Sequence, residues 1–219
     1  MVDTELLQGV ELLADLTEAE MADVVKVAET ARYLRNDVVF HEGDAPDRLC
    51  VVVSGRIAIA NKSIDGRESM LALMERGDVF GDMGLFDGLG RSAEARALEP
   101  SELIEVPFIP LAAVYESRPA LLWGVVRLLA GRLRNTDSAL ADSVFLDVTG
   151  RTAKRLLELA GDADEFALPI TQEELAGMVG ASRERVNKAI ASFVRLRWIE
   201  QQDRRYRITN RAELEHRAR

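Results

Sequence analysis

The sequence predicts an α+β protein in which a β jelly roll is followed by a long helix and a winged helix-turn-helix. Three observations lead to this prediction. Short apolar runs separated by glycines fill residues 31–106, an apolar heptad pattern follows Pro119, and two short amphipathic helices joined by a glycine lie within 170–198. We place the three parts at residues 1–118, 119–146 and 147–219.

Composition limits the possible classes of protein. Of the 219 residues, 47% are hydrophobic and 30% are charged, which is typical of a globular chain. No apolar run approaches the roughly 20 residues that span a bilayer, and no secretion signal begins the chain, so we expect a cytoplasmic protein without a membrane partner. The single cysteine, Cys50, excludes an internal disulfide framework and cysteine-based zinc or iron–sulfur sites. With only two histidines we expect no metal site.

The charge of the chain is unevenly distributed. The net charge is −9, but residues 1–149 carry −12 and residues 150–219 carry +3. We therefore expect two domains, and we expect any polyanionic partner to bind the C-terminal one.

The N-terminal part is predicted to be a short helical region followed by strands. Residues 5–29 have helical spacing, and Thr17 with Glu20 fits a capping box. Short strands with turn signals every 8–12 residues then indicate a sandwich or barrel, and a jelly roll limits exposed sheet edges. We expect turns with positive φ at the glycines at positions 43, 55, 66 and 77.

A long helix without internal proline is predicted from Pro119 to Asp147. Alternating spacings of four and three residues form an a/d stripe, which we expect to pair with a second copy of the chain. Packing of the stripe on the chain's own β-domain is the alternative, although other apolar positions could serve there: Leu121, Trp123, Val125 and Leu128. The stripe consists of Leu122, Val126, Leu129, Leu133, Thr136, Leu140 and Ser143.

A helix-turn-helix is the clearest motif in the sequence. After an interruption at 147–150 and a helix at 151–160, Thr171 and Glu174 form a second capping box. Gly180 suits a tight turn between helices, and Ser182 is a favourable N-cap for the second helix. One face of that helix is apolar and should be buried: Val186, Ala189, Ile190, Phe193 and Val194.

The other face of the second helix is polar near its N-terminus. Arginine and lysine can donate to guanine and glutamate can accept from cytosine, and the first residues of a recognition helix reach base edges. We therefore expect this face to read DNA, an ordinary solvated face being the alternative: Arg183, Glu184, Asn187 and Lys188.

Phosphate contacts are expected beside this reading face. Thr171, Gln172 and Ser182 stand at helix N-termini, where hydroxyl and N–H groups hold phosphates. A hairpin predicted over 199–208 carries three arginines that could contact phosphates or simply lie in a solvated turn: Arg204, Arg205 and Arg207.

Three stretches, one of them in the helix-turn-helix just described, are similar to sequences of a known family. They are VFGDMGLFDGLGRSA at 79–93, FLDVTGR at 145–151 and VGASRERVNK at 179–188, and HEGD…VSG at 41–55 agrees with them. Together they resemble the catabolite activator/fumarate–nitrate regulator family, in particular the cyclic AMP receptor proteins, over essentially the whole chain. The resemblance implies a homodimeric transcription regulator that binds cyclic AMP in the jelly roll, reads a TGTGA-type palindrome and contacts RNA polymerase.

The resemblance also implies a nucleotide site in the cassette at 79–93. Gly81, Arg91 and Ser92 would contact the phosphate, with Met83 beside them, and charge-assisted hydrogen bonds from arginine suit that role. Position 82 is usually a glutamate that accepts from the ribose hydroxyl, whereas this chain has Asp82.

On the long helix, Thr136 matches a threonine that the family uses on adenine, and Arg132 matches a neighbouring basic position. Asp137 stands where serine or asparagine is more familiar. Because a carboxylate only accepts hydrogen bonds, we expect it to favour the amine of adenine over the keto oxygen of guanine.

In the recognition helix the resemblance assigns base contacts to Arg183, Glu184 and Lys188, and phosphate contacts to Ser182 and Thr171. Lys188 stands where arginine is common. Arg185 replaces a common threonine and could add a phosphate contact.

Two other functions stay open at this point. Asp82 and Asp137 alter the pocket, so the same DNA-binding regulator could be independent of nucleotide or sense another small ligand. A cyclic-nucleotide module that regulates a protein partner without DNA is the other. An enzyme is the least supported class, because no nucleophile–base set or pair of acid/base carboxylates stands out, and the Asp82–Arg91 pair is expected to bind phosphate rather than break it.

Overall fold

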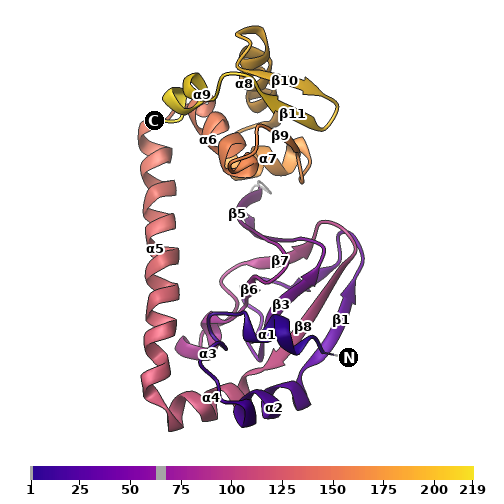
Figure 1. Cartoon of the computed structure of the whole chain (residues 1–219), viewed down its shortest axis with the longest axis vertical. Coiled ribbons are helices and arrows are strands. Elements are labelled where there is room, and N and C mark those ends of the chain that lie inside the picture. Colours follow the sequence, from indigo (N-terminus) through magenta and orange to yellow (C-terminus); the bar gives the residue numbers. More distant parts are fainter. Residues whose placement is uncertain (1, 63–67) are drawn as a thin grey trace. The chain divides into compact units, whose positions relative to one another are not determined.

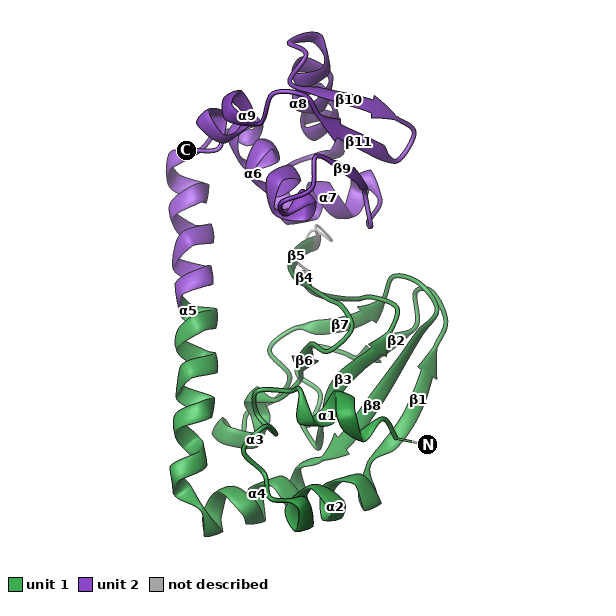
Figure 2. Ribbon diagram, viewed as in Figure 1, with its two compact units in different colours: residues 1–133 green, residues 134–219 purple. Residues whose placement is uncertain are grey.

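The computed structural model describes residues 2–62 and 68–219, and Figure 1 shows the path of the chain. The chain forms two compact units, residues 1–133 and 134–219 (Figure 2). The division falls inside the long helix α5 (Leu122–Phe145), so this helix contributes to both units.

The N-terminal segment forms two helices, so the single helix expected over 5–29 is wrong. α1 spans Thr4–Gln8 and α2 spans Glu18–Val27. Thr17 begins α2 with the predicted capping box, in which its hydroxyl accepts from the Glu20 N–H (3.3 Å) and its own N–H donates to the Glu20 carboxylate (2.7 Å). A capping box requires a non-helical residue at its start, so a helix cannot run through position 17.

The strands of the first unit pair into two antiparallel four-stranded sheets, as predicted for a jelly roll. One sheet has the order β1-β8-β3-β6 and the other β2-β7-β4-β5. Their bounds are β1 Glu29–Tyr33, β2 Val38–Phe40, β3 Arg48–Ser54, β4 Ile57–Lys62, β5 Glu68–Met74, β6 Val79–Phe80, β7 Glu94–Ala97 and β8 Ser101–Pro107.

Strand β3 contributes to two separate cores because its side chains alternate between the faces of the sheet. Cys50 and Val52 pack between the two sheets, against residues such as Ile57 of the opposite sheet. Leu49 and Val51 pack on the other face, in a core that includes the helices α1 and α2. Cys50 is fully buried, as predicted for a strand residue.

The long helix follows α4 (Phe108–Ser117) and a 3₁₀ turn at Pro119–Leu121. Leu121, Val125 and Leu128 pack on the helical core of the first unit, as expected. Trp123 is 68% exposed, so the expectation that it faces the β-domain is wrong. At about 100° per residue, position 123 points roughly 200° away from position 121, on the opposite side of the helix.

The a/d stripe of α5 lies on the exposed side of the helix. Its five leucine and valine residues are between 39% and 63% exposed, and Thr136 and Ser143 are exposed as well. The stripe therefore does not pack on the chain's own β-domain, which was the alternative.

The second unit contains the predicted helix-turn-helix and hairpin. α6 (Val148–Ala160) starts three residues earlier than expected because Asp147 caps it, and α7 (Gln172–Val179) and α8 (Arg183–Arg195) follow. The hairpin is β10 (Ile199–Gln202) and β11 (Arg205–Ile208). β9 (Glu165–Ala167) adds to it, and α9 (Arg211–Arg217) comes last; the sequence interpretation did not include either.

The apolar face of α8 is buried at Val186, Ala189, Ile190 and Phe193, whereas Val194 is 39% exposed and lies outside it. None of the described helices is long and apolar enough to cross a membrane.

Three of the four glycines assigned to turns have positive φ: Gly43, Gly55 and Gly77. The fourth, at position 66, lies outside the described residues. A Cβ added at Gly55 would lie 2.3 Å from Ser101 Oγ and 2.6 Å from Pro100 O, whereas one added at Gly77 would meet nothing within 4 Å.

This contrast predicts a graded loss of stability. Gly77→Ala should cost only the strain of positive φ, on the order of 1–2 kcal/mol. Gly55→Ala should cost about 1–3 kcal/mol more, because backbone must move away from the new methyl group. Urea unfolding of the two variants checks this, and equal losses would show that the contact at Gly55 is soft.

Candidate functional site

The cassette is a strand, a glycine turn and a short helix, formed by β6, Gly81 and α3 (Met83–Asp87). Gly81 has φ +73°, and a Cβ there would lie 2.6 Å from Arg91 Nη1. A Cβ on Gly84 would lie 2.3 Å from the Pro46 side chain. The turn thus places bare backbone directly against its neighbours, which only glycine allows.

Arg91 follows the cassette and is nearly enclosed, with a side chain 4% exposed. Its Nη1 donates to Gly81 O (2.5 Å) and its Nη2 to Arg48 O (2.8 Å), while the guanidinium lies 4.2 Å from the centre of the Phe40 ring. Its Nε is buried without a hydrogen-bond partner among the described residues. Burial lowers the pKa of Arg91, but an arginine stays charged at any physiological pH. A buried cation with an unused donor is suited to an anion.

A cavity of about 310 Å³ opens beside Arg91. Of the residues predicted to hold the nucleotide, Arg91 is the one that lines it. The other lining residues are Val39, Phe40, Asp44, Ala45, Asp47, Arg48, Cys50 and Glu105.

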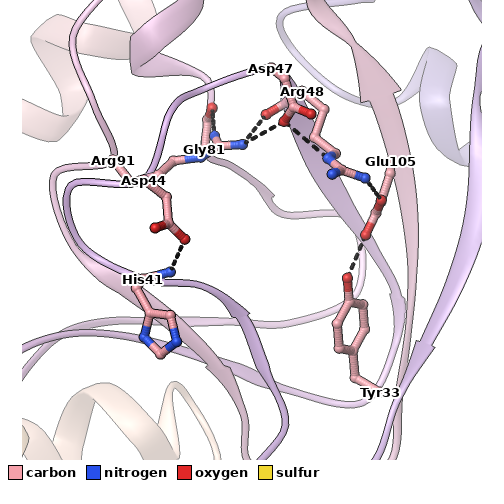
Figure 3. A network of polar contacts seen from close by, with 8 residues as sticks. All are labelled: Tyr33, His41, Asp44, Asp47, Arg48, Gly81, Arg91 and Glu105. Atoms are coloured by element: carbon pink, nitrogen blue, oxygen red, sulfur yellow. Dashed lines mark hydrogen bonds and ion pairs between the residues drawn. The ribbon is translucent and has the colours of Figure 1, made fainter.

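A network of polar contacts joins several of these lining residues (Figure 3). Asp47 lies 3.6 Å from Arg91 Nη2 and 3.0 Å from Arg48 Nε, and Arg48 Nη1 donates to Glu105 (2.5 Å). Tyr33 donates its hydroxyl to the second oxygen of Glu105 (2.5 Å). The sequence interpretation missed this network because Tyr33, Arg48 and Glu105 come from three different strands, β1, β3 and β8. The one available signal was Glu105 itself, a charged residue in a predominantly apolar part of its strand.

At the inner end of the network Glu105 is buried and Tyr33 is half-buried. Burial, followed by the hydrogen bond to Glu105, raises the pKa of Tyr33 above its usual range. Burial, followed by the negative charge of Glu105, raises the pKa of Cys50 to about 12. Both groups are therefore neutral near pH 7, and Arg48 balances the charge of Glu105.

Asp82 pairs with Arg132 of α5, whereas Arg91, with which the sequence analysis grouped it as a phosphate-binding pair, donates to Gly81 O and Arg48 O. Arg132 Nη1 lies 3.0 Å from both carboxylate oxygens of Asp82, and Nη2 donates to Val79 O (3.0 Å). Asp82 is only 1% exposed, so the nearest available cation takes its charge. The structure thus joins the cassette to α5 within the first unit.

The other predicted nucleotide residues lie at the surface. The Ser92 hydroxyl is 3.7 Å from the Met83 sulfur, and Met83 is 46% exposed. Thr136 and Asp137 are exposed residues of α5 in the second unit. Thr136 follows Arg132 by four residues and therefore shares its face of the helix.

The helix-turn-helix is built as its sequence predicts. The Thr171 hydroxyl accepts from the Glu174 N–H (3.2 Å) and the Thr171 N–H donates to the Glu174 carboxylate (2.6 Å), which begins α7. Gly180 ends α7 with φ +67°, and the Ser182 hydroxyl accepts from the Arg185 N–H (3.4 Å) to begin α8.

The reading face of α8 is exposed at three of its four predicted positions, Arg183, Glu184 and Lys188, and Arg185, which was expected to contact phosphate, is exposed as well. Asn187 is only half-buried, but its Oδ1 is buried without a partner among the described residues. The Gln172 side chain lies next to the Tyr206 hydroxyl of β11 and acts against the rise that burial gives the pKa of Tyr206.

Two of the three hairpin arginines have protein partners. Arg207 pairs with Glu165 (2.7 Å) and Glu200 (3.6 Å), and Arg204 donates weakly to Leu168 O (3.4 Å). Arg205 is exposed. No group of three or more potential metal-ligating side chains comes together among the residues described.

Two family models match the chain. A cyclic nucleotide-binding domain matches residues 30–118, and a Crp-like helix-turn-helix domain matches residues 150–217. These ranges contain the cassette and the reading helix described above.

Relatives match the chain over most of its length. A CRP-like cAMP-activated global transcriptional regulator of Mycobacterium tuberculosis is 35% identical over 222 residues, covering 98% of this chain and 99% of that protein. The cAMP-activated global transcriptional regulator CRP of Pasteurella multocida is 34% identical over 73% of this chain and 79% of its own. A solved CRP/FNR-family transcriptional regulator of Thermus thermophilus is 26% identical with a TM-score of 0.70, covering 87% of this chain and 98% of that one.

The burial of Asp82 makes its ion pair testable. Arg132→Met should destabilise the protein by about 1–3 kcal/mol, because it leaves a buried carboxylate without its partner. Asp82→Asn in the same chain removes the charge, so the double variant should recover part of the loss, with a coupling of about 1 kcal/mol or more. Urea unfolding of the four proteins measures the cycle, and strictly additive losses would contradict the pairing.

Proposed function

Because this chain belongs to the CRP/FNR family of transcription regulators, we propose that it is a homodimer whose affinity for DNA is controlled by cyclic AMP. Family membership already makes it a DNA-binding transcription regulator with a cyclic nucleotide-binding domain, and not an enzyme. The observation that carries the finer proposal is the enclosed guanidinium of Arg91 beside the cassette.

The hydrogen bonds of Arg91 in this structure support the binding of a cyclic phosphate. Both of its hydrogen bonds go to neutral carbonyl oxygens, of Gly81 and Arg48, and its Nε has an unused donor. An anionic phosphate oxygen is a stronger acceptor than a carbonyl, so a phosphodiester would replace these contacts. The bare backbone at Gly81 and the hydroxyl of Ser92 would complete the phosphate contacts.

The ribose and base contacts would come from Asp82 of the cassette and from residues on α5. Asp82 keeps acceptor capacity beyond its bonds to Arg132, so a ribose hydroxyl can donate to it. Thr136 and Asp137 would meet the adenine. Two similar relatives are named as cAMP-activated, which supports cyclic AMP as the ligand.

The dimer interface that we propose is the a/d stripe of α5, within the dimerisation segment 119–146. Five of its seven residues are leucine or valine, each at least 39% exposed. An apolar stripe of this length at heptad spacing is covered in water by a second helix of the same kind. The two-fold assembly would present two copies of α8 to successive major grooves, roughly 34 Å apart.

DNA recognition falls to α8 in this proposal. Arg183, Glu184 and Lys188 would contact base edges of a TGTGA-type half-site. Phosphates would be held by Thr171, Ser182 and Arg185, while Gln172 and Asn187 contribute less because their side chains are engaged or partly buried. A regulator of this kind works in the cytoplasm with RNA polymerase as its further partner.

Cyclic AMP would act by favouring one of two dimer arrangements. A ligand shifts such an equilibrium only as far as it binds one arrangement more tightly. The Asp82–Arg132 pair is suited to this, because a ligand that engages Asp82 also acts on the helix that carries the dimer stripe.

One observation favours a second candidate, a DNA-binding regulator that does not need the nucleotide. Arg132 contacts both oxygens of Asp82, and aspartate is shorter than the glutamate common in the family. A pocket closed in this way could have lost its ribose contact or could accept another small ligand.

A DNA-binding titration with cyclic AMP separates the two candidates. We expect at least about tenfold tighter binding to a TGTGA palindrome at saturating nucleotide, a weaker effect of cyclic GMP, and little binding to scrambled duplex. Fluorescence anisotropy of labelled duplexes measures all three. Arg91→Gln should abolish the effect, and Arg35→Gln, at an exposed arginine of the same domain, should leave it intact.

A nucleotide-independent preference for the palindrome would establish the second candidate. Equal affinity for palindrome and scrambled duplex at every nucleotide concentration would refute both, and would favour a module that acts on a protein partner.

The reading role of α8 predicts the effect of a single substitution. Arg183→Ala should weaken specific binding by about 1–3 kcal/mol and remove the preference at one guanine, because a bidentate contact is lost. Arg195→Ala at the other end of the same helix is the matched control. Anisotropy on a set of single-base variants of the half-site checks this, and a uniform loss on all sequences would assign Arg183 to phosphate instead.

A further inference from the structure

The junction between α5 and α6 consists of two residues, Leu146 and Asp147, and Asp147 is extended and held by its own side chain. α5 ends at Phe145, and Asp147 has φ −72° and ψ 176° before α6 begins at Val148. Asp147 Oδ1 accepts from the Gly150 N–H (2.8 Å), which caps α6. A cap alone fixes the start of α6 but leaves the direction of α5 free.

Helix α9 closes on this junction. Arg217 donates from Nη2 to both carboxylate oxygens of Asp147. A Cβ on Gly150 would lie 3.0 Å from both Arg217 Nη1 and Arg217 O, so the glycine permits the close approach. The cap and the arginine together lower the pKa of Asp147, the Gly150 hydrogen bond having the larger effect. The carboxylate therefore stays charged throughout the physiological range.

The base of α9 is firmly attached to the DNA-binding domain. Leu214 is fully buried, and Arg211 bonds Asp164 (3.1 Å), Gly161 O (3.0 Å) and Ala163 O (2.7 Å). Arg217 is thus presented to Asp147 from a fixed support rather than from a loose end.

Two cations of α6 hold the other side of the junction. Lys154 Nζ lies 2.5 Å from Asp142 and 3.2 Å from Ser138 Oγ, both on α5. Arg151 donates to Leu146 O (2.7 Å) and to Val179 O at the end of α7 (2.8 Å). These contacts explain why the C-terminal part of α5 belongs to the same compact unit as the helix-turn-helix.

We propose that Arg217 and Lys154 form a clasp across the α5–α6 junction, and that this clasp transmits the allosteric signal from α5 to the recognition helix. The clasp rests on the proposed function, because it needs a nucleotide effect to transmit. Arg217 and Lys154 are positioning residues: they hold α5 and α8 in one rigid body, so that a rotation of α5 turns the reading face with it. Without the clasp, α5 would turn about Asp147 and leave α8 behind.

The test compares the allosteric ratio, defined as the DNA affinity at saturating cyclic AMP divided by that without it, in full-length variants. In Arg217→Ala and Lys154→Met we expect this ratio to fall at least about fivefold towards one. Cyclic AMP binding to the free protein, measured by calorimetry, should change little. Arg219→Ala, at an exposed arginine two residues from the clasp, is the matched control. A merely structural role would lower the melting temperature and leave the ratio unchanged.

Two further variants keep the test informative if Arg217→Ala or Lys154→Met fails to fold. Asp147→Asn keeps an acceptor for the Gly150 N–H but loses the charge that Arg217 binds. It should lower the ratio as much as Arg217→Ala does, and combining the two substitutions should lower the ratio no further. The swap Lys154→Asp with Asp142→Lys should restore the ratio lost in Lys154→Met.

The clasp is refuted if the wild type shows a nucleotide effect and all of these variants keep it in full. A wild-type ratio of one would refute the proposed function itself, and the clasp with it.

Discussion

The ion pair between Asp82 and Arg132 connects the cassette to the long helix, and the sensor half of the molecule depends on it. A carboxylate that is 1% exposed is costly to leave unpaired, so the cassette holds its form only while α5 supplies the guanidinium. The same guanidinium bonds Val79 O at the end of the preceding strand. The Arg132 side chain therefore couples the cassette to the helix, and a ligand that competes for Asp82 acts on both.

The two parts of the chain carry net charges of opposite sign. The −12 charge of residues 1–149 repels a nucleic acid, and the +3 charge of residues 150–219 attracts one. The anion that we propose for the acidic end is a small one, which would be held by an arginine enclosed against Phe40 rather than by a basic surface. A buried site of this kind would select by shape as well as charge, whereas the exposed face of α8 would meet its proposed partner in solvent.

Local signals made much of this structure predictable. The capping boxes at Thr17 and Thr171, the left-handed Gly180 and the N-cap Ser182 depend only on residues three or four positions away. The heptad stripe likewise follows from the period of one helix. These features are local in sequence, and each was found where it was expected. The division of residues 5–29 into two helices was missed because the apolar spacing was taken to indicate one continuous helix. The capping box at Thr17 marks the start of a new helix.

Long-range pairings were not predictable in the same way. Tyr33 and Glu105 meet because β1 pairs with β8, and Arg48 joins them from β3 on the other side of β8. No spacing of residue types in the sequence predicts the register of these strands. The partner of Asp82 depends on how α5 crosses the cassette, and the clasp at Asp147 depends on α9, whose seven residues carry too weak a helical pattern to stand out.

The burial of Cys50 makes this protein convenient for spectroscopy. Its thiol is enclosed between the sheets, and its raised pKa of about 12 keeps it protonated in ordinary buffers, so maleimide or nitroxide reagents find no native thiolate. A cysteine engineered on the exposed surface of α5 or α8 would take up the label selectively. Distances between such labels could then be followed in solution without first replacing the cysteine that nature left in the chain.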